Sequence, residues 1–265
     1  LNERMRAGRY RASAVRRVRI PKEDGETREL GIPTFEDRIV QRAVTMLLEP
    51  IYEAEFYPSS YGFRPGKSAH QALNALRREC FECKVSTIID ADIQGCFDNI
   101  DHEKLKEVVR NKVEDGKVIQ YIGKWLNAGV LDGTEILHPA TGTPQGGVIS
   151  PMLANIFLHT VLDEWFYTVV KPLLKGRSFL IRYADDFVLG FEKLAAANGS
   201  QLSIHITQLP FPTACHYGFR RCIAIKNMAL LGFFHHCLSQ WMIAIALHRA
   251  SESDQVVARF AFRCA

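Results

Sequence analysis

Three aspartates lie where the sequence predicts that strands end or turn. Residues 85–93 alternate as in a strand and carry Asp92 near the end, while Asp185 and Asp186 occupy the turn of an apolar hairpin predicted over 178–191. Carboxylates brought together from separate strands repel one another unless cations lie among them, and hard oxygen ligands of this kind suit Mg²⁺. Two such ions can activate an attacking oxygen and stabilise a leaving one, so these residues point to in-line phosphoryl transfer.

The elements around these carboxylates have to bring them together. A solvated turn is the alternative explanation of Asp185 and Asp186, because Asp is a common turn residue. A basic hairpin is predicted over 14–33, and the mixture of strands and helices without a regular βα alternation favours an α+β fold with helices on one side of the sheet. Helical periods are predicted over 35–49 (where Pro50 ends the helix), 67–80, 103–113 (with Asp101 as N-cap), 117–127 and 150–170.

Composition excludes several classes of protein. The chain has 265 residues, of which 47% are hydrophobic and 10% aromatic, which is too rich for a disordered chain. It has 18 Gly and 11 Pro, too few for a fibrous sequence. There is no apolar run of about 18 residues to span a bilayer and no apolar segment of a signal peptide at the start. We therefore expect a soluble protein with no membrane partner.

The formal net charge of +4 conceals an uneven distribution. The first twenty residues hold seven Arg and one Glu, which predicts either a solvated arm or contacts with a phosphate backbone. Residues 194–265 hold 6 basic and only 2 acidic residues, Glu252 and Asp254. A soluble surface normally carries both signs of charge. We therefore interpret this tail as the product of a frameshift or fusion; the alternative is a small buried domain.

The sequence contains several blocks that occur in a characteristic order. The blocks are 32–41, 48–51, 60–66 with 68–70, 92–100, 143–151 and 183–186, the last being a Tyr-x-Asp-Asp box. Together they resemble the reverse transcriptase domain of group II intron-encoded proteins. They extend over about 180 residues, and the ordered set is far more specific than the Tyr-x-Asp-Asp box alone.

The resemblance implies a right-hand polymerase fold of the α+β class, with fingers and a palm. In such proteins the palm is a ferredoxin-like antiparallel sheet packed on helices. Residues 1–80 would form the fingers, with the basic arm and hairpin, and 81–193 the palm with the catalytic aspartates. The similarity fades near Leu194, and the later palm blocks and the helical thumb of the family are not recognisable in 194–265. We therefore expect a fragment, and one that is inactive if it needs the thumb.

The resemblance also assigns roles at the carboxylates. Asp92, Asp185 and Asp186 match the residues that hold two Mg²⁺ ions in this family, and the carbonyl of Ile93 matches a backbone ligand. Phe97 falls where an aromatic ring closes off the sugar 2′ position, which would favour dNTP over rNTP because no space remains for the hydroxyl. An ordinary core phenylalanine is the alternative explanation of Phe97.

Further residues match substrate and nucleic-acid contacts of the family. Lys22 and Arg28 correspond to finger residues that neutralise the triphosphate, although charges on a solvated hairpin edge would look the same. Gln145 and Gly146 resemble the element that lies against the nascent base pair, the alternative being a plain loop before a helix. The residues expected to contact nucleic acid are Arg16, Arg17, Arg19 and Arg64.

The reaction implied is RNA-directed addition of dNTPs to a primer 3′-OH. The implied partners are an RNA template, a DNA or RNA primer and intron RNA, in the cytoplasm of a bacterium or the matrix of an organelle. Two alternatives stay open from the sequence. One is an RNA-binding maturase that assists splicing without polymerising, and the other is a reverse transcriptase of a defence or diversity-generating system derived from a retroelement.

Overall fold

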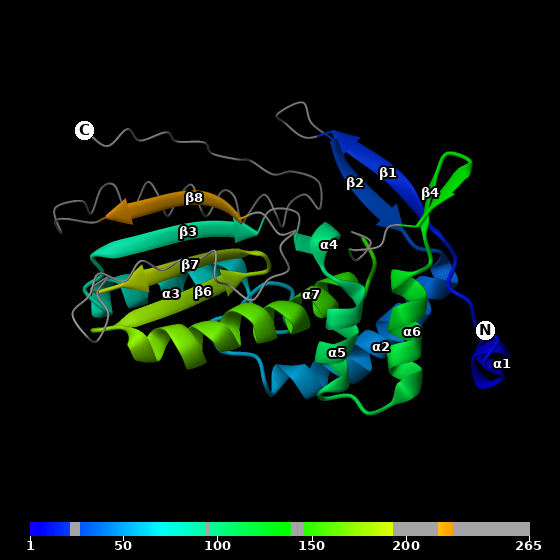
Figure 1. Ribbon diagram of the computed structural model, residues 1–265, viewed down its shortest axis with the longest axis horizontal. Helices are drawn as coiled ribbons and strands as arrows, with labels where there is room; N and C mark the ends of the chain where they lie inside the picture. The colour runs from blue at the N-terminus through cyan, green and yellow to red at the C-terminus, as the bar shows by residue number, and fades with distance from the viewer. Residues whose placement is uncertain (22–26, 94–95, 139–141, 143–145, 193–216, 225–265) are drawn as a thin grey trace.

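The computed structural model describes residues 1–21, 27–93, 96–138, 142, 146–192 and 217–224 (Figure 1). The strands are β1 Val15–Pro21, β2 Thr27–Ile32, β3 Thr87–Ile93, β4 Val130–Asp132, β5 Glu135–Leu137, β6 Ser178–Tyr183, β7 Asp186–Phe191 and β8 Tyr217–Ala224. The helices are α1 Asn2–Arg6, α2 Phe35–Glu53, α3 Ala69–Glu82, α4 Cys96–Asn99, α5 His102–Arg110, α6 Gly116–Leu126 and α7 Ser150–Leu158, followed by the wider π-helical turns η1 His159–Glu164 and η2 Phe166–Val170 and the 3₁₀ turn η3 Lys171–Leu173.

The larger sheet has the strand order β6-β7-β3-β8, and every neighbouring pair is antiparallel. Between β3 and β6 the chain runs through helices, and β7 then inserts between these two strands (Figure 1). This is the split βαβ arrangement of ferredoxin-like sheets. The predicted α+β class and the ferredoxin-like palm sheet are therefore confirmed.

Alternation along β3 divides the two faces of this sheet as the sequence predicts. Ile89, Ala91 and Ile93 are buried on one face, whereas Asp90 and Asp92 are half-buried on the other. Burying only the apolar face of a strand sets its register, because a slip of one residue would expose every apolar side chain. The carboxylates are therefore held on the face opposite the main core.

Helices cover both faces of the larger sheet, which corrects the prediction that they lie on one side. The segment from α7 to η2 packs its buried residues into one cluster with Leu180, Phe187 and Leu189. On the opposite face, α3 packs small alanines against β6 in a second cluster that includes Ile181 and Tyr183. The sequence of a strand that is apolar on both faces does not show whether helices cover one face of the sheet or both. Helix α3 packs on β6, at one side of this face. The ends of β3 and β7, at Asp92 and Asp186, are only half-buried.

Helix α2 runs past the point where the sequence predicts its end. It begins at its predicted start, with Thr34 as N-cap, but it continues through Pro50 to Glu53. Proline lacks the N–H for the helical hydrogen bond and crowds the preceding turn. Here the last turn is held by Tyr52, which is buried, stacks on Phe56 and donates a hydrogen bond to the Val109 carbonyl at 3.4 Å. Tertiary packing therefore offsets the cost of the proline.

The apolar residues that predict this helix do not face the core. Ile39, Met46 and Leu47 are 47%, 58% and 60% exposed, whereas the face turned to the core includes the polar residues Asp37 and Gln41. The helical period itself is confirmed, but it marks the outer face. The inner face carries a second apolar row with a spacing of four residues, which packs into the main hydrophobic cluster: Val40, Val44, Leu48 and Tyr52.

The other predicted helices are present with small shifts of their ends. Ser68 caps α3, and Asp101 caps α5 by accepting hydrogen bonds from the backbone N–H groups of Glu103 and Lys104, both at 2.9 Å. The N-cap of α5 is thus confirmed. The long helix predicted over 150–170 changes after Leu158 from α-helical to π-helical turns.

The smaller sheet has the order β2-β1-β4-β5 and contains the predicted basic hairpin. Strand β4 pairs in parallel with β1 and forms a hairpin with β5. Neither β4 nor β5 is predicted from the sequence, because three residues are too few to show an alternation. Residues near 130 therefore contribute to the same sheet as residues 15–32.

The region after Leu194 contributes one described strand, β8, which pairs antiparallel with β3 at the edge of the larger sheet. A bulge interrupts this pairing between Asp90 and Ala91. The origin of residues 194–265 as a frameshift or fusion product stays a prediction. Within the part of the chain that the structure describes, no helix has the length and apolar character needed to cross a membrane.

Candidate active site

The register of the larger sheet places Asp92 directly opposite Asp186. The pairing of β3 with β7 runs from Thr87 and Phe191 to Asp92 and Asp186, where both strands reach the same end of the sheet. Residues directly opposite in an antiparallel pair point to the same face, with Cβ atoms about 5 Å apart. The two carboxylates predicted from separate segments are therefore neighbours, as the proposed chemistry requires.

Asp185 lies beside them in the turn between β6 and β7. Tyr183 pairs with Asp186, so Ala184 and Asp185 form a two-residue hairpin turn. Ala184 has a φ of 57°, a left-handed conformation that a residue with a Cβ rarely adopts unless its surroundings hold it. The conformation of this turn is therefore held by contacts with the residues around it.

One of these contacts comes from Gly62, in the segment between α2 and α3. A Cβ at position 62 would lie 2.3 Å from the backbone nitrogen of Ala184, closer than any real contact. The Gly62 carbonyl accepts a hydrogen bond from the side-chain amide of Asn155 at 2.8 Å. Only glycine allows the backbone to lie this close to the turn.

The donor set fits a hard divalent cation in its chemistry. Asp92, Asp185 and Asp186 are all half-buried, so each residue is partly in contact with solvent. Across the described residues, no three His, Cys, Asp or Glu side chains converge closely enough to form a preformed metal site. An ion bound here would therefore have to draw the three carboxylates together. Ile93 is 1% exposed in the core, which leaves only its backbone for a metal.

Phe97 lies in the short helix α4, which follows β3. Its side chain is 9% exposed and belongs to the main hydrophobic cluster. The ring is therefore packed against other core residues near the end of the strand that carries Asp92. This placement is compatible with a ring whose edge limits the space beside the carboxylates, and equally with a core residue, so the role of Phe97 stays a prediction.

The basic side chains of β1 lie on two faces of the smaller sheet. Arg17 and Arg19 both pair with Glu29 of β2 and Asp132 of β4, with Arg19 Nη2 2.6 Å from Asp132 Oδ2. Hydrogen bonds from Arg19, together with the charges of Arg19 and Arg17, hold the pKa of Asp132 below its usual range. Arg16 is exposed on the other face.

The residues predicted to bind the triphosphate and the base pair are only partly described. Arg28 lies in β2 opposite Ile20, whereas Lys22 and Gln145 fall outside the described residues. Gly146 has a φ of 103°, and a Cβ there would lie 3.0 Å from the Gly31 carbonyl oxygen. Gly146 therefore lies directly against β2 at Gly31.

A family model described as "Reverse transcriptase (RNA-dependent DNA polymerase)" matches residues 20–209. The chain belongs to the reverse transcriptase family. The match begins within β1, includes all three aspartates and continues past Leu194, where the charge distribution changes. The resemblance drawn from the ordered sequence blocks is thus confirmed.

Curated relatives of this reverse transcriptase include a group II intron-encoded protein. "Group II intron-encoded protein LtrA" of Lactococcus lactis subsp. cremoris is 44% identical over 162 residues, which cover 61% of this chain and 26% of that protein. "Protein YkfC" of Escherichia coli is 36% identical over 219 residues, or 71% of this chain and 57% of that protein. The chain thus spans between about a quarter and just over half of these relatives.

Solved structures support the fold of this reverse transcriptase. The apo telomerase from Candida tropicalis, truncated from its C-terminal domain, has a TM-score of 0.53 and 14% sequence identity. The match covers 72% of this chain and 48% of that one. At this level of identity the similarity concerns the fold, and it confirms the right-hand polymerase architecture.

Arg64 does not have the surroundings expected of a nucleic-acid contact in this reverse transcriptase. Its side chain is buried and forms an ion pair with Glu53, with Nη2 2.8 Å from Oε2. It also donates hydrogen bonds to the carbonyls of Tyr57 and Ser60 and lies over the Phe56 ring. The placement favours a structural role that joins α2 to the segment before α3, and corrects the expectation of a surface contact.

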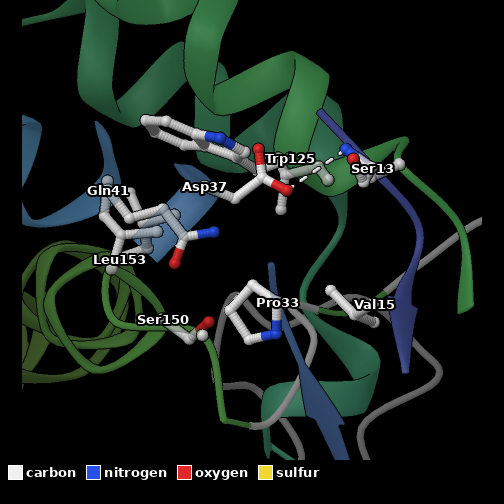
Figure 2. Close-up of a pocket in the computed structure, with 12 residues that line it drawn as sticks. Ser13, Val15, Pro33, Asp37, Gln41, Trp125, Ser150 and Leu153 are labelled. Atoms are coloured by element: carbon white, nitrogen blue, oxygen red, sulfur yellow. Dashed lines mark hydrogen bonds between the residues drawn. The ribbon is translucent and has the colours of Figure 1, made fainter. Parts of the chain in front are cut away.

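Asp37 is a buried carboxylate that the sequence does not single out. Figure 2 shows it pointing toward Ser13, whose backbone N–H donates to it at 3.2 Å, with Trp125 beside it. The hydroxyls of Tyr10 and Thr34 also donate to Asp37, and the Tyr10 hydroxyl accepts a hydrogen bond from Trp125. Asp37 thus ties the N-terminal arm to α2 and α6.

The cavity beside Asp37 is structural. Its volume is about 10 Å³, enough for about one water molecule. It is lined by the arm, α2, α6 and the start of α7, and none of the three aspartates of the candidate active site borders it. Gln41, also in its lining, accepts a hydrogen bond from the backbone N–H of Val148 at 2.8 Å. The cavity therefore marks where the N-terminal arm, α2, α6 and the start of α7 meet.

Proposed function

We propose that this chain carries the catalytic centre of an RNA-directed DNA polymerase of the group II intron type. The observation that carries the proposal is the pairing of Asp92 with Asp186, with Asp185 in the adjoining turn. These are the three acidic positions that the family resemblance assigns to catalysis. The similarity to a group II intron-encoded protein supports the same type of enzyme.

In the proposed reaction, a primer 3′-oxygen attacks the α-phosphorus of a dNTP. Asp92, Asp185 and Asp186 would hold two Mg²⁺ ions, with the Ile93 carbonyl as a further ligand. When bound, the ions would activate the attacking oxygen and stabilise the leaving pyrophosphate oxygen. Held at the end of paired strands, the carboxylates keep the reacting groups in line, which accounts for much of the rate in such transfers.

We propose further that residues of the basic hairpin and of the loop before α7 contact the substrates. Lys22 and Arg28, on the basic hairpin, would neutralise the triphosphate, and Arg16, Arg17 and Arg19 would add positive charge along the strand. Gln145 and Gly146 would lie against the nascent base pair, a role supported by the close approach of Gly146 to β2. The proposed partners are an RNA template, a DNA or RNA primer and intron RNA.

Template-directed incorporation tests this function. The purified 265-residue chain is given homopolymer RNA templates with complementary primers, and each of the four dNTPs in turn. Incorporation of only the complementary dNTP is expected, together with binding of structured RNA that weakens as salt increases. RNA binding without any extension would contradict the polymerase and favour a splicing cofactor.

Replacement of Phe97 with Val tests the proposed sugar gate. The smaller side chain opens space beside the sugar, so the ratio of kcat/KM for rNTP over dNTP should rise by about tenfold or more, since a lost steric clash is worth a few kcal/mol. Because Phe97 is also a core residue, thermal unfolding is measured in parallel. A lower melting temperature with unchanged sugar selectivity would assign Phe97 to the core alone.

A further inference from the structure

A buried arginine lies next to the turn that carries Asp185. Arg182, in β6, has 0% exposure, although charged side chains are almost never fully buried unless they are paired. Its carboxylate partner, Asp163 in η1, is also 0% exposed. Burying two charges costs several kcal/mol for each ion. Apolar residues of similar volume in their place often stabilise a folded protein equally well or better. A gain in stability therefore does not explain why an ion pair is buried at this place in the fold.

The guanidinium of Arg182 uses all three of its nitrogens in separate contacts. Nε and Nη2 donate to the two oxygens of Asp163 at 2.9 and 2.7 Å, a bidentate arrangement that fixes the plane of the group. Nη1 donates to Asn155 Oδ1 and to the Ala184 carbonyl, both at 2.9 Å. The Ala184 carbonyl belongs to the peptide bond that joins Ala184 to Asp185. Arg182 thus orients the peptide immediately before a catalytic aspartate.

Asn155 extends the same network to the other side of the turn. Its amide nitrogen donates to the Gly62 carbonyl at 2.8 Å, and Gly62 lies against the nitrogen of Ala184. The backbone of Arg182 also exchanges hydrogen bonds with this segment: Tyr61 N–H donates to the Arg182 carbonyl and Arg182 N–H to the Ser59 carbonyl, both at 2.9 Å. The left-handed residue Ala184 is therefore held from both sides.

The π-helical turns after α7 explain how one helix supplies both side chains. Asn155 and Asp163 are eight residues apart, which in an ideal α-helix is about 2.2 turns and would separate their faces. Each residue of a π-helix advances the rotation by less, because its hydrogen bonds span five residues. The π-helical turns of η1 thus bring Asp163 back toward the face of Asn155. A π-helical segment of this kind often marks a functional site.

The ionisation of Asp163 is consistent with a permanent pair. Burial alone would raise the pKa of this carboxyl, but the charge of Arg182 and its two hydrogen bonds, with the His159 ring 3.8 Å away, lower it below the ordinary value. A depressed pKa in the folded state means that this stabilisation is present above the unfolded pKa and is lost only as the pH falls through the folded one. The pair therefore stays charged at neutral pH.

We infer that Arg182, Asp163 and Asn155 form a positioning clamp that sets the turn carrying Asp185 and Asp186. The inference rests on the proposed function, which makes these aspartates catalytic. None of the three clamp residues touches substrate in this account; they act through the Ala184 peptide. Arginine is required because lysine cannot bond Asp163 with two donors while also reaching Asn155 and Ala184.

The test replaces both charges, with Arg182→Met and Asp163→Leu in one variant, so that no buried charge is left without a partner. A double replacement of this kind is often neutral or stabilising. Hydrogen–deuterium exchange of the apo protein should become at least about tenfold faster at the turn, residues 183–186, and stay unchanged in β3 and α3. In primer extension, the Mg²⁺ concentration for half-maximal rate should rise about fivefold or more, while KM for the primer–template stays within about twofold.

Two further variants separate positioning from stability. Arg182→Lys keeps the charge and should show part of the Mg²⁺ shift. Val170→Ala, at the end of η2, creates a core cavity and should lower the melting temperature with the Mg²⁺ dependence unchanged. Unchanged exchange at the turn in the double variant would overturn the clamp. A wild-type chain that does not polymerise would overturn the proposed function, while the exchange measurement would still decide the clamp.

Discussion

Replacement of Asp92 with Asn should nearly abolish nucleotide addition and slightly stabilise the metal-free fold. The carboxylate lies opposite Asp186, so its loss removes a charged oxygen ligand from the proposed cation site. Several kcal/mol of charge stabilisation in the transition state corresponds to about a 10³-fold lower kcat/KM. Like charges placed directly opposite destabilise a sheet by about 0.2–1 kcal/mol, so the melting temperature without metal should rise by about 1–3 °C.

Measuring both the rate and the melting temperature of Asp92→Asn separates a loss of catalysis from a loss of folding. Single-nucleotide addition gives kcat/KM, and calorimetry with and without Mg²⁺ gives the stability. Asp90→Asn is the matched control, since Asp90 lies two residues earlier on the same face, opposite Val188 rather than an acid. It should retain activity within a few-fold. If Asp92→Asn kept more than a tenth of the wild-type rate, the carboxylate would not be a catalytic ligand.

Replacement of Gly62 with Ala should reduce activity about 10²-fold, because a shift of about 1 Å in a reacting group can cost that much. The added Cβ would lie 2.3 Å from the Ala184 nitrogen, so either the turn or the segment with Gly62 must move. Overpacking of this kind typically costs about 1–3 kcal/mol, which a folded domain can tolerate. The loss should therefore appear in kcat, measured at a temperature where circular dichroism shows the variant folded.

Gly116→Ala provides the control for this substitution. Gly116 begins α6, and a Cβ there would meet no atom within 4 Å. Its activity should equal that of the wild type, and its stability should be equal or slightly higher because alanine loses less backbone entropy in a helix. Full activity of Gly62→Ala would show that the turn tolerates displacement and would remove the main reason for a glycine at this position.

The strand that carries Asp92 and the turn that carries Asp185 could be predicted from the sequence because each rests on a local pattern. Alternation along 85–93 assigns Asp92 to a face, and the hairpin around Asp185 fixes its own register by the length of its turn. The pairing of β3 with β7 depends on contacts nearly a hundred residues apart, and it became predictable only through the ordered blocks of the family. Local patterns thus predicted the strand and the turn that carry the aspartates, and the resemblance to the family predicted that they lie together.

The support of the site could not be predicted in this way. In Ile181-Arg182-Tyr183 the alternation suggests that Arg182 faces solvent, yet both faces of β6 are covered and its partner Asp163 lies on another element. Gly62 requires knowledge of which backbone approaches it. Helix α2 is apolar on both faces, and only tertiary packing shows that the row with Val40, Val44 and Leu48 is the buried one.

The most direct test of the account is primer extension on poly(rA) with oligo(dT), in Mg²⁺ and dTTP, by the purified chain and by Asp185→Ala. The account predicts extension by the wild type and a signal at least about 10³-fold lower for the variant, whose fold is checked by circular dichroism. Equal extension by both proteins would assign the signal to a contaminating polymerase and contradict the proposed catalytic centre. Absence of extension by both would contradict the polymerase activity of this chain.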